Sequence, residues 1–103
     1  MKAIKIDVIK KEVYEVDYKG TDGIYKQLDC TCFCLVPKKL PGGDTILVDD
    51  EGIYRRPQIG EFIVSGYHDE LSGHGIVVGN TRSGNSRDCQ SSVEEIKRLI
   101  RFV

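Results

Sequence analysis

The segment from Gly79 to Gly84, together with Arg87, contains the residues best suited to binding an anion. Glycines allow neighbouring backbone N–H groups to point at one ligand, and the guanidinium groups of Arg82 and Arg87 would add positive charge. The segment lacks both the Gly-Lys-Ser/Thr pattern of a phosphate-binding loop and the strand–helix context of a dinucleotide site. It therefore predicts only a general small-ligand or nucleotide site, built from Gly79, Asn80, Arg82, Gly84 and Arg87.

Three of the four cysteines alternate along the chain, as Cys30, Cys32 and Cys34. In a strand their thiols would share one face, with successive side chains roughly 6.5–7 Å apart. Tetrahedral zinc holds its sulfur ligands within about 4 Å of one another, so three such thiols would meet only around a bent strand. Cys89 would complete a set of four, but no Cys-x-x-Cys pair is present. The pattern favours small core residues over a metal or redox site, and no metal is expected.

Both histidines lie in one polar stretch, as His68-Asp69-Glu70 and His74. Histidine beside carboxylates suits metal binding or acid–base chemistry. The spacing matches no ligand motif, because the helical His-Glu-x-x-His arrangement is incompatible with the serine and glycines around His74. We interpret this stretch as a solvated loop.

The acidic run Asp49-Asp50-Glu51, with Asp44 nearby, is followed by Gly52. Carboxylates in series can hold a divalent cation, but this pattern between two apolar segments is also typical of a hairpin turn. We interpret the run as a turn. No segment carries a local nucleophile motif, so no catalytic residue is assigned and an enzyme is not favoured.

The 103 residues are 40% hydrophobic and 30% charged, which predicts a single globular domain over residues 1–103. The net charge of −1 argues against a nucleic-acid binder, because such proteins usually carry a basic excess. The N-terminus lacks the apolar core of a signal peptide, and no apolar run approaches the roughly 20 residues that span a bilayer. We therefore expect a cytoplasmic protein with reduced cysteines and no membrane partner.

Short apolar segments separated by turns predict about five to six strands in an antiparallel or mixed sheet. Residues 2–18 have the alternation of a β-hairpin, with Lys10-Lys11 at its turn. The apolar segment 30–36 is expected to form a central strand. Further strands are expected at 45–48, with a return strand starting at 53–54, and at 61–66 and 75–79, with a polar loop over 67–75.

Two helices would complete a single compact α+β domain. Ile24, Tyr25 and Leu28 share one face of a short helix near residues 22–29. Ser92 and Glu95 form a capping box, in which the serine accepts a bond from the third N–H and the glutamate reaches back. An apolar stripe then predicts a C-terminal helix near residues 92–102; its members are Val93, Ile96, Leu99, Ile100 and Val103.

Three segments carry a family resemblance: Met1–Asp7, Leu47–Gly52 and Gly73–Gly79, the last followed by a polar turn and the C-terminal helix. With them, nearly the whole chain resembles the uncharacterised family catalogued as domain of unknown function 3846. The chain departs from that family's usual pattern at Arg55–Gly60 and Thr81–Ser86. The family occurs in phages, plasmids and bacterial genomes and has no established activity. The resemblance therefore implies a mobile-element origin and a cytoplasmic setting.

Two functional hypotheses from different classes follow. The first is a non-enzymatic binding module with an unidentified protein partner, which also allows homodimerisation through an exposed edge strand. The second is a small-ligand or nucleotide-binding domain that uses the Gly79–Gly84 loop with Arg82 and Arg87. Neither hypothesis requires a cofactor, and none is expected.

Overall fold

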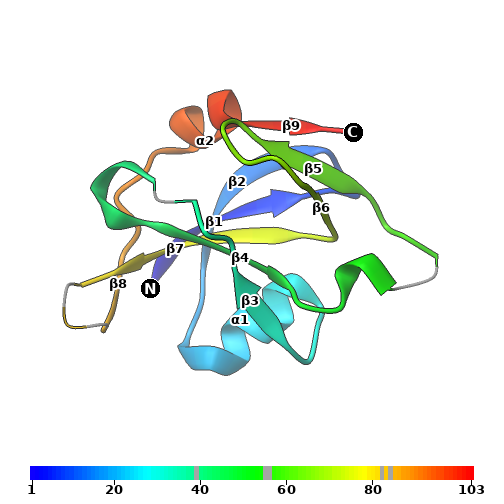
Figure 1. The fold of residues 1–103 in the computed structure, drawn as a ribbon. Helices are drawn as coiled ribbons and strands as arrows, with labels where there is room; N and C mark the ends of the chain where they lie inside the picture. The colour runs from blue at the N-terminus through cyan, green and yellow to red at the C-terminus, as the bar shows by residue number, and fades with distance from the viewer. Residues whose placement is uncertain (39, 55–56, 82, 84) are drawn as a thin grey trace.

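The computed structural model describes residues 1–38, 40–54, 57–81, 83 and 85–103. Within these residues, two antiparallel sheets and two helices form the α+β domain that the sequence predicts (Figure 1). The larger sheet has the order β2-β1-β7-β4-β3, with β8 paired to the end of β7. Its strands are β1 (Lys2–Asp7), β2 (Glu12–Asp17), β3 (Phe33–Leu35), β4 (Thr45–Asp49), β7 (Gly75–Asn80) and β8 (Ser86–Arg87).

The smaller sheet has the order β6-β5-β9 and lies in the opposite layer from the first helix (Figure 1). Its strands are β5 (Glu61–Val64), β6 (Glu70–Ser72) and β9 (Ile100–Phe102). The helices are α1 (Gly20–Leu28) and α2 (Val93–Leu99), and the short 3₁₀ turns are η1 (Pro41–Gly43) and η2 (Gly52–Tyr54). None of the helices in the described part of the chain is long and apolar enough to cross a bilayer.

The larger sheet is buried on both faces because alternate side chains point to opposite layers. On one face, Ile6 and Val48 pack with Phe62 of β5 and with the residues of α2 and β9. On the other face, Leu47 and Val78 pack with the apolar side of α1. The sheet is thus covered by α1 on one side and by α2 with the smaller sheet on the other (Figure 1).

The two helices begin near the predicted positions, but the second one ends early. α1 spans Gly20–Leu28 against the expected 22–29. The capping box of α2 forms as predicted, since the Ser92 side chain accepts from the Glu95 N–H while Glu95 accepts from Ser92. The helix expected to reach residue 102 stops at Leu99, because residues 100–102 pair with β5 as strand β9. Val103, expected on the buried stripe, is exposed.

Three further expectations about strands need correction. The central strand expected over 30–36 covers only Phe33–Leu35 and lies at the end of the sheet order beside β4. Cys30 lies before it, after the end of α1. Residues 53–54 belong to η2 rather than to a return strand. The loop expected over 67–75 contains β6, which pairs with β5 through Glu61↔Ser72 and Phe62↔Leu71. Short polar strands such as β6 carry too little apolar periodicity to be recognised.

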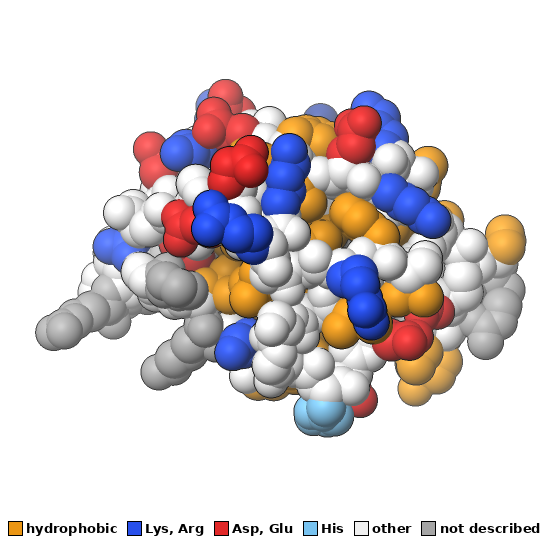
Figure 2. Space-filling view, turned by 90° about the horizontal axis from the view of Figure 1, so that it is seen from above, with side chains coloured by type: hydrophobic (Ala, Val, Ile, Leu, Met, Phe, Trp, Pro, Cys, Tyr) orange, Lys and Arg blue, Asp and Glu red, His pale blue; other side chains and the backbone are white. Residues whose placement is uncertain are grey.

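Basic and acidic side chains are interspersed on the face shown in Figure 2. Over the described residues of this face they form no continuous stripe of one sign.

Candidate ligand-binding groove

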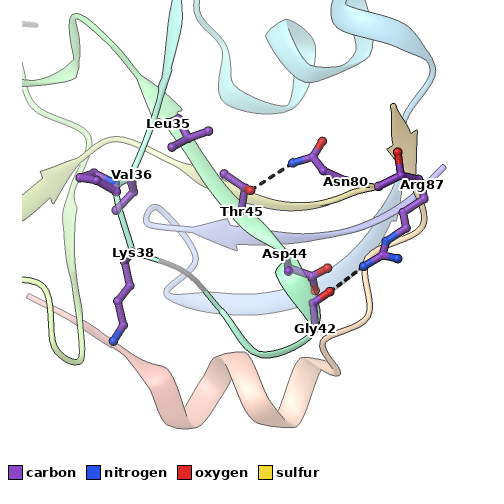
Figure 3. Close-up of a pocket in the computed structure, with 11 residues that line it drawn as sticks. Leu35, Val36, Lys38, Gly42, Asp44, Thr45, Asn80 and Arg87 are labelled. Carbon is purple, nitrogen blue, oxygen red and sulfur yellow. Dashed lines mark hydrogen bonds between the residues drawn. The ribbon is translucent and has the colours of Figure 1, made fainter. Parts of the chain in front are cut away.

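A groove opens where the larger sheet extends beyond α1. Thr45 and Val78 are opposite each other in the β4–β7 register, and Leu35 is opposite Leu47 in the β3–β4 register. Leu35, Thr45 and Asn80 therefore share the sheet face that packs on α1 at Leu47 and Val78. The groove has a volume of about 670 Å³ and is lined by residues 35–38, 42–45, 80–81 and 87 (Figure 3).

The floor of the groove is polar and joins two strands. The Asn80 side chain at the end of β7 donates from Nδ2 to Thr45 Oγ1 at the start of β4, over 3.1 Å (Figure 3). A hydroxyl and a primary amide each have donor and acceptor capacity beyond one bond. This pair can therefore also bind a polar group of a ligand, while Leu35 and Val36 supply an apolar wall.

Arg87 closes the groove at the β8 side. Its Nη2 donates to the carbonyl oxygen of Gly42 over 2.6 Å, which ties η1 to the β7–β8 hairpin (Figure 3). Gly42 has φ +81°, and a Cβ there would lie 2.9 Å from Gln90 Cβ, so the turn requires glycine. The Arg87 Nε is enclosed and has no hydrogen-bond acceptor among the described residues.

Asp44 fixes the back of the groove. It is only 2% exposed, and its carboxylate accepts the backbone N–H groups of Gln90, at 2.9 Å, and of Ser91, at 2.6 Å. A carboxylate bonded in this way is satisfied without a cation. The sequence marks Asp44 only as a neighbour of the acidic run Asp49-Asp50-Glu51. Its role in the groove was not predictable, because its partners are 46 and 47 residues away and no local pattern marks them.

The residues predicted for an anion or nucleotide site are only partly brought together. Asn80 and Arg87 both line the groove. Gly79 does not; it lies in β7 opposite Arg87, and a Cβ there would be 2.5 Å from the carbonyl oxygen of Asp88. Glycine is therefore needed at position 79 for the close approach of β8. Arg82 and Gly84 lie outside the described residues.

The sequence predicts both histidines in one solvated loop, but only His68 is exposed. His68 is exposed and lies 3.2 Å from Asp69. His74, in contrast, is 6% exposed; its Nδ1 accepts the N–H of Val8 at 3.2 Å and lies 3.7 Å from Asp7 Oδ1. His74 is buried because it directly precedes β7, between the ends of β1 and β4.

The buried cluster around His74 holds the turn of the first hairpin. Asp7 accepts the N–H groups of Ile9 and Lys10, and the Tyr14 hydroxyl donates to it over 2.7 Å. Burial raises the pKa of Asp7, but the bonds from Lys10 and Tyr14 and the charge of His74 outweigh it and lower that pKa overall. Burial, followed by the charge of Lys5, lowers the pKa of His74. At pH 7 Asp7 is therefore ionised and His74 neutral, and His74 adds its charge beside Asp7 only at lower pH.

The cysteines are not a set of interior thiols on one face. Cys30 and Cys89 are buried, Cys34 is half-buried and Cys32 is exposed. Burial raises the pKa of both Cys34 and Cys89. Within residues 1–38, 40–54, 57–81, 83 and 85–103, no three His, Cys, Asp or Glu side chains are placed to hold a metal ion.

No protein-family model, no curated protein and no solved structure matches this chain. The groove and its chemistry therefore carry the functional argument.

Proposed function

We propose that this protein is a non-enzymatic binding module whose groove holds a segment of a protein partner. The observation that carries the proposal is the position of Leu35, which is 58% exposed at the mouth of the groove. Leu35 lies in β3, which is an edge strand of the larger sheet among the described residues. An extended segment can add to such an edge through backbone hydrogen bonds, with side-chain pockets giving specificity.

The lining of the groove suits such a segment. Leu35, Val36 and Pro37 provide an apolar contact surface, and the bonded pair Thr45–Asn80 provides polar groups beside it. Protein interfaces commonly combine an apolar centre with a polar rim. Because β3 is short and is followed by Pro37, it offers few backbone groups, so the side chains of the groove must supply most of the specificity.

A phage or mobile-element origin and a cytoplasmic setting are part of the same proposal. They are supported by the family resemblance of Met1–Asp7, Leu47–Gly52 and Gly73–Gly79. Homodimerisation through the β3 edge would use the same surface. Sedimentation would test it, since a dimer of this kind should dissociate in a Leu35→Arg variant.

Affinity capture with matched baits tests the proposal. Wild-type protein, Leu35→Arg and the control Ile9→Arg are compared, because Ile9 is also exposed, at 64%, but lies at the β1–β2 turn. We expect a partner that wild type and Ile9→Arg retain and Leu35→Arg loses, with circular dichroism showing three folded proteins. Equal retention by both variants, or no partner at all, would contradict the proposal.

The second candidate is a small-ligand or nucleotide site in the same groove. It is favoured by the groove volume of about 670 Å³, which falls in the usual range for ligand pockets, and by Asn80 and Arg87 in its lining. Thermal-shift measurements with nucleotides test it, since a ligand at 100 times its Kd adds about 2.7 kcal/mol of stability. Asn80→Ala should reduce the shift. No shift with any nucleotide would remove this candidate.

A further inference from the structure

The groove is lined by cationic side chains that form no ion pair with a described carboxylate. Lys38 and Arg87 are its cationic side chains in the described part of the chain, and neither has a carboxylate within 4.0 Å there. Asp44 also lines the groove, but its oxygens accept the N–H groups of Gln90 and Ser91. A ligand that fits this lining should therefore bring negative charge.

Arg87 is held in place before any ligand binds. Its backbone pairs with Gly79 across the β7–β8 ladder, and its Nη2 is anchored on the Gly42 carbonyl oxygen. Fixing a long side chain in advance lowers the entropy cost of binding. Arginine also presents its N–H groups in a planar fork that matches the two oxygens of a carboxylate or phosphate.

One donor of this fork is unused. The Arg87 Nε is enclosed, and no described residue accepts its hydrogen bond. Leaving a buried donor unpaired is unfavourable, but an enclosed Nε is out of reach of a ligand, so the terminal N–H groups of the guanidinium are the donors that a ligand can meet.

We infer that the groove contains an oxyanion subsite at the guanidinium of Arg87, which accepts a carboxylate or phosphate group of the ligand. This inference rests on the proposed binding function and names the chemistry that the ligand must carry. The oxyanion would accept from the terminal N–H groups of the Arg87 guanidinium, while Thr45 and Asn80 bind a neighbouring polar group. Lys38 would contribute long-range attraction from the other side of the groove.

Nuclear magnetic resonance of the full-length chain tests the subsite directly. The Nε–H resonance of Arg87 is assigned by its loss in Arg87→Lys, and the protein is titrated with inorganic phosphate in one series and acetate in another, at constant ionic strength. We expect a saturable shift of this resonance together with the amides of Gly42 and Asn80. Arg87→Lys should weaken binding at least tenfold, as followed by those amides, whereas Arg101→Lys, at an exposed arginine of β9, should leave it unchanged.

The two titrations distinguish the sources of the oxyanion. Saturation by phosphate alone identifies a phosphate-bearing ligand, and saturation by acetate alone identifies a carboxylate such as an acidic side chain. An unmoved Arg87 resonance, or equal non-saturating shifts at Arg87 and Arg101, would overturn the inference. If that occurred while a Leu35-dependent partner was still captured, the oxyanion subsite would be wrong and the binding module would stand.

Discussion

Asp7 is the residue on which the first hairpin depends most. The turn lacks the Asn-Gly or Asp-Gly pair that favours tight hairpins, and Lys11 adopts a positive φ of 55°. The Asp7 carboxylate compensates by accepting two turn N–H groups and the Tyr14 hydroxyl. A single buried carboxylate therefore replaces the usual turn sequence.

Replacing Asp7 with alanine should lower the free energy of unfolding by about 3 kcal/mol, because hydrogen bonds to charged groups contribute about 1.5–3 kcal/mol each and are not additive. Tyr14→Phe removes one of these bonds and should cost about half as much. Urea denaturation measures both. Asp17→Ala, at an exposed position of β2, is the control and should change stability by less than about 0.5 kcal/mol. If Asp7→Ala also lost less than about 0.5 kcal/mol, the role assigned to Asp7 would be contradicted.

His74 should make stability depend on pH. Its pKa is lowered by burial and by Lys5, so the unfolded chain takes up a proton at about pH 6.5, before the folded chain does. The stabilising contribution of neutral His74 is complete above that pH and is lost as the pH falls through it toward the lower folded pKa. We therefore expect the free energy of unfolding to decrease from pH 7.5 to pH 5.5.

Urea unfolding at a series of pH values provides the test of His74. His74→Gln, which can still accept the Val8 N–H, should flatten the dependence. His68→Gln, at the exposed histidine, should preserve it. Equal pH dependence of the free energy of unfolding in the two variants would show that His74 does not cause the effect.

The cysteines should react in the order of their exposure. Cys32 is exposed and should be alkylated first at neutral pH. The raised pKa of Cys34 and of Cys89 reduces their thiolate fraction, and burial further protects Cys89 and Cys30. Timed alkylation with iodoacetamide and peptide mass spectrometry gives the order. Rapid labelling of Cys89 in the folded protein would show that this packing is wrong.

At the scale of elements, α2 depends on its N-terminal cap. A helix of seven residues is too short to be stable alone, and it also positions β9 against β5. Ser92→Ala removes the bond to the Glu95 N–H and should cost about 1 kcal/mol, measured by urea denaturation. Lys97→Ala, which removes an exposed pair with Glu94 at 3.9 Å, should cost less than about 0.5 kcal/mol. Equal effects of the two changes would argue against the capping box.

Local patterns predicted the elements whose residues signal their own structure. The β1–β2 alternation and the Ser92–Glu95 capping box are both confirmed. The end of α2 was not predictable, because Ile100 fits a helical stripe equally well until its pairing with Val64 is known. The same limit applies to Cys30, which the sequence predicts in a strand, because an apolar segment does not reveal which of its residues find a partner strand.

At the scale of the whole molecule, the groove is made by contacts between distant segments. Arg87 meets Gly42 across 45 residues, and Asn80 meets Thr45 across 35. The sequence singled out Asn80 and Arg87 through local composition, but it gave no sign of Leu35, Thr45 or Asp44 as their neighbours. The strand order β7-β4-β3 brings these residues together, and that order follows from long-range pairing.

Mapping the binding surface on the full-length, ¹⁵N-labelled protein tests the central claim most directly. The protein retained by the wild-type bait is added, and the amide resonances that shift are located on the structure. We predict that they cluster at residues 35–38, 42–45 and 80–81, and that Leu35→Arg abolishes the shifts. Shifts centred instead on η2 and the β1–β2 turn, with the groove amides unchanged, would contradict the claim that the groove is the binding surface.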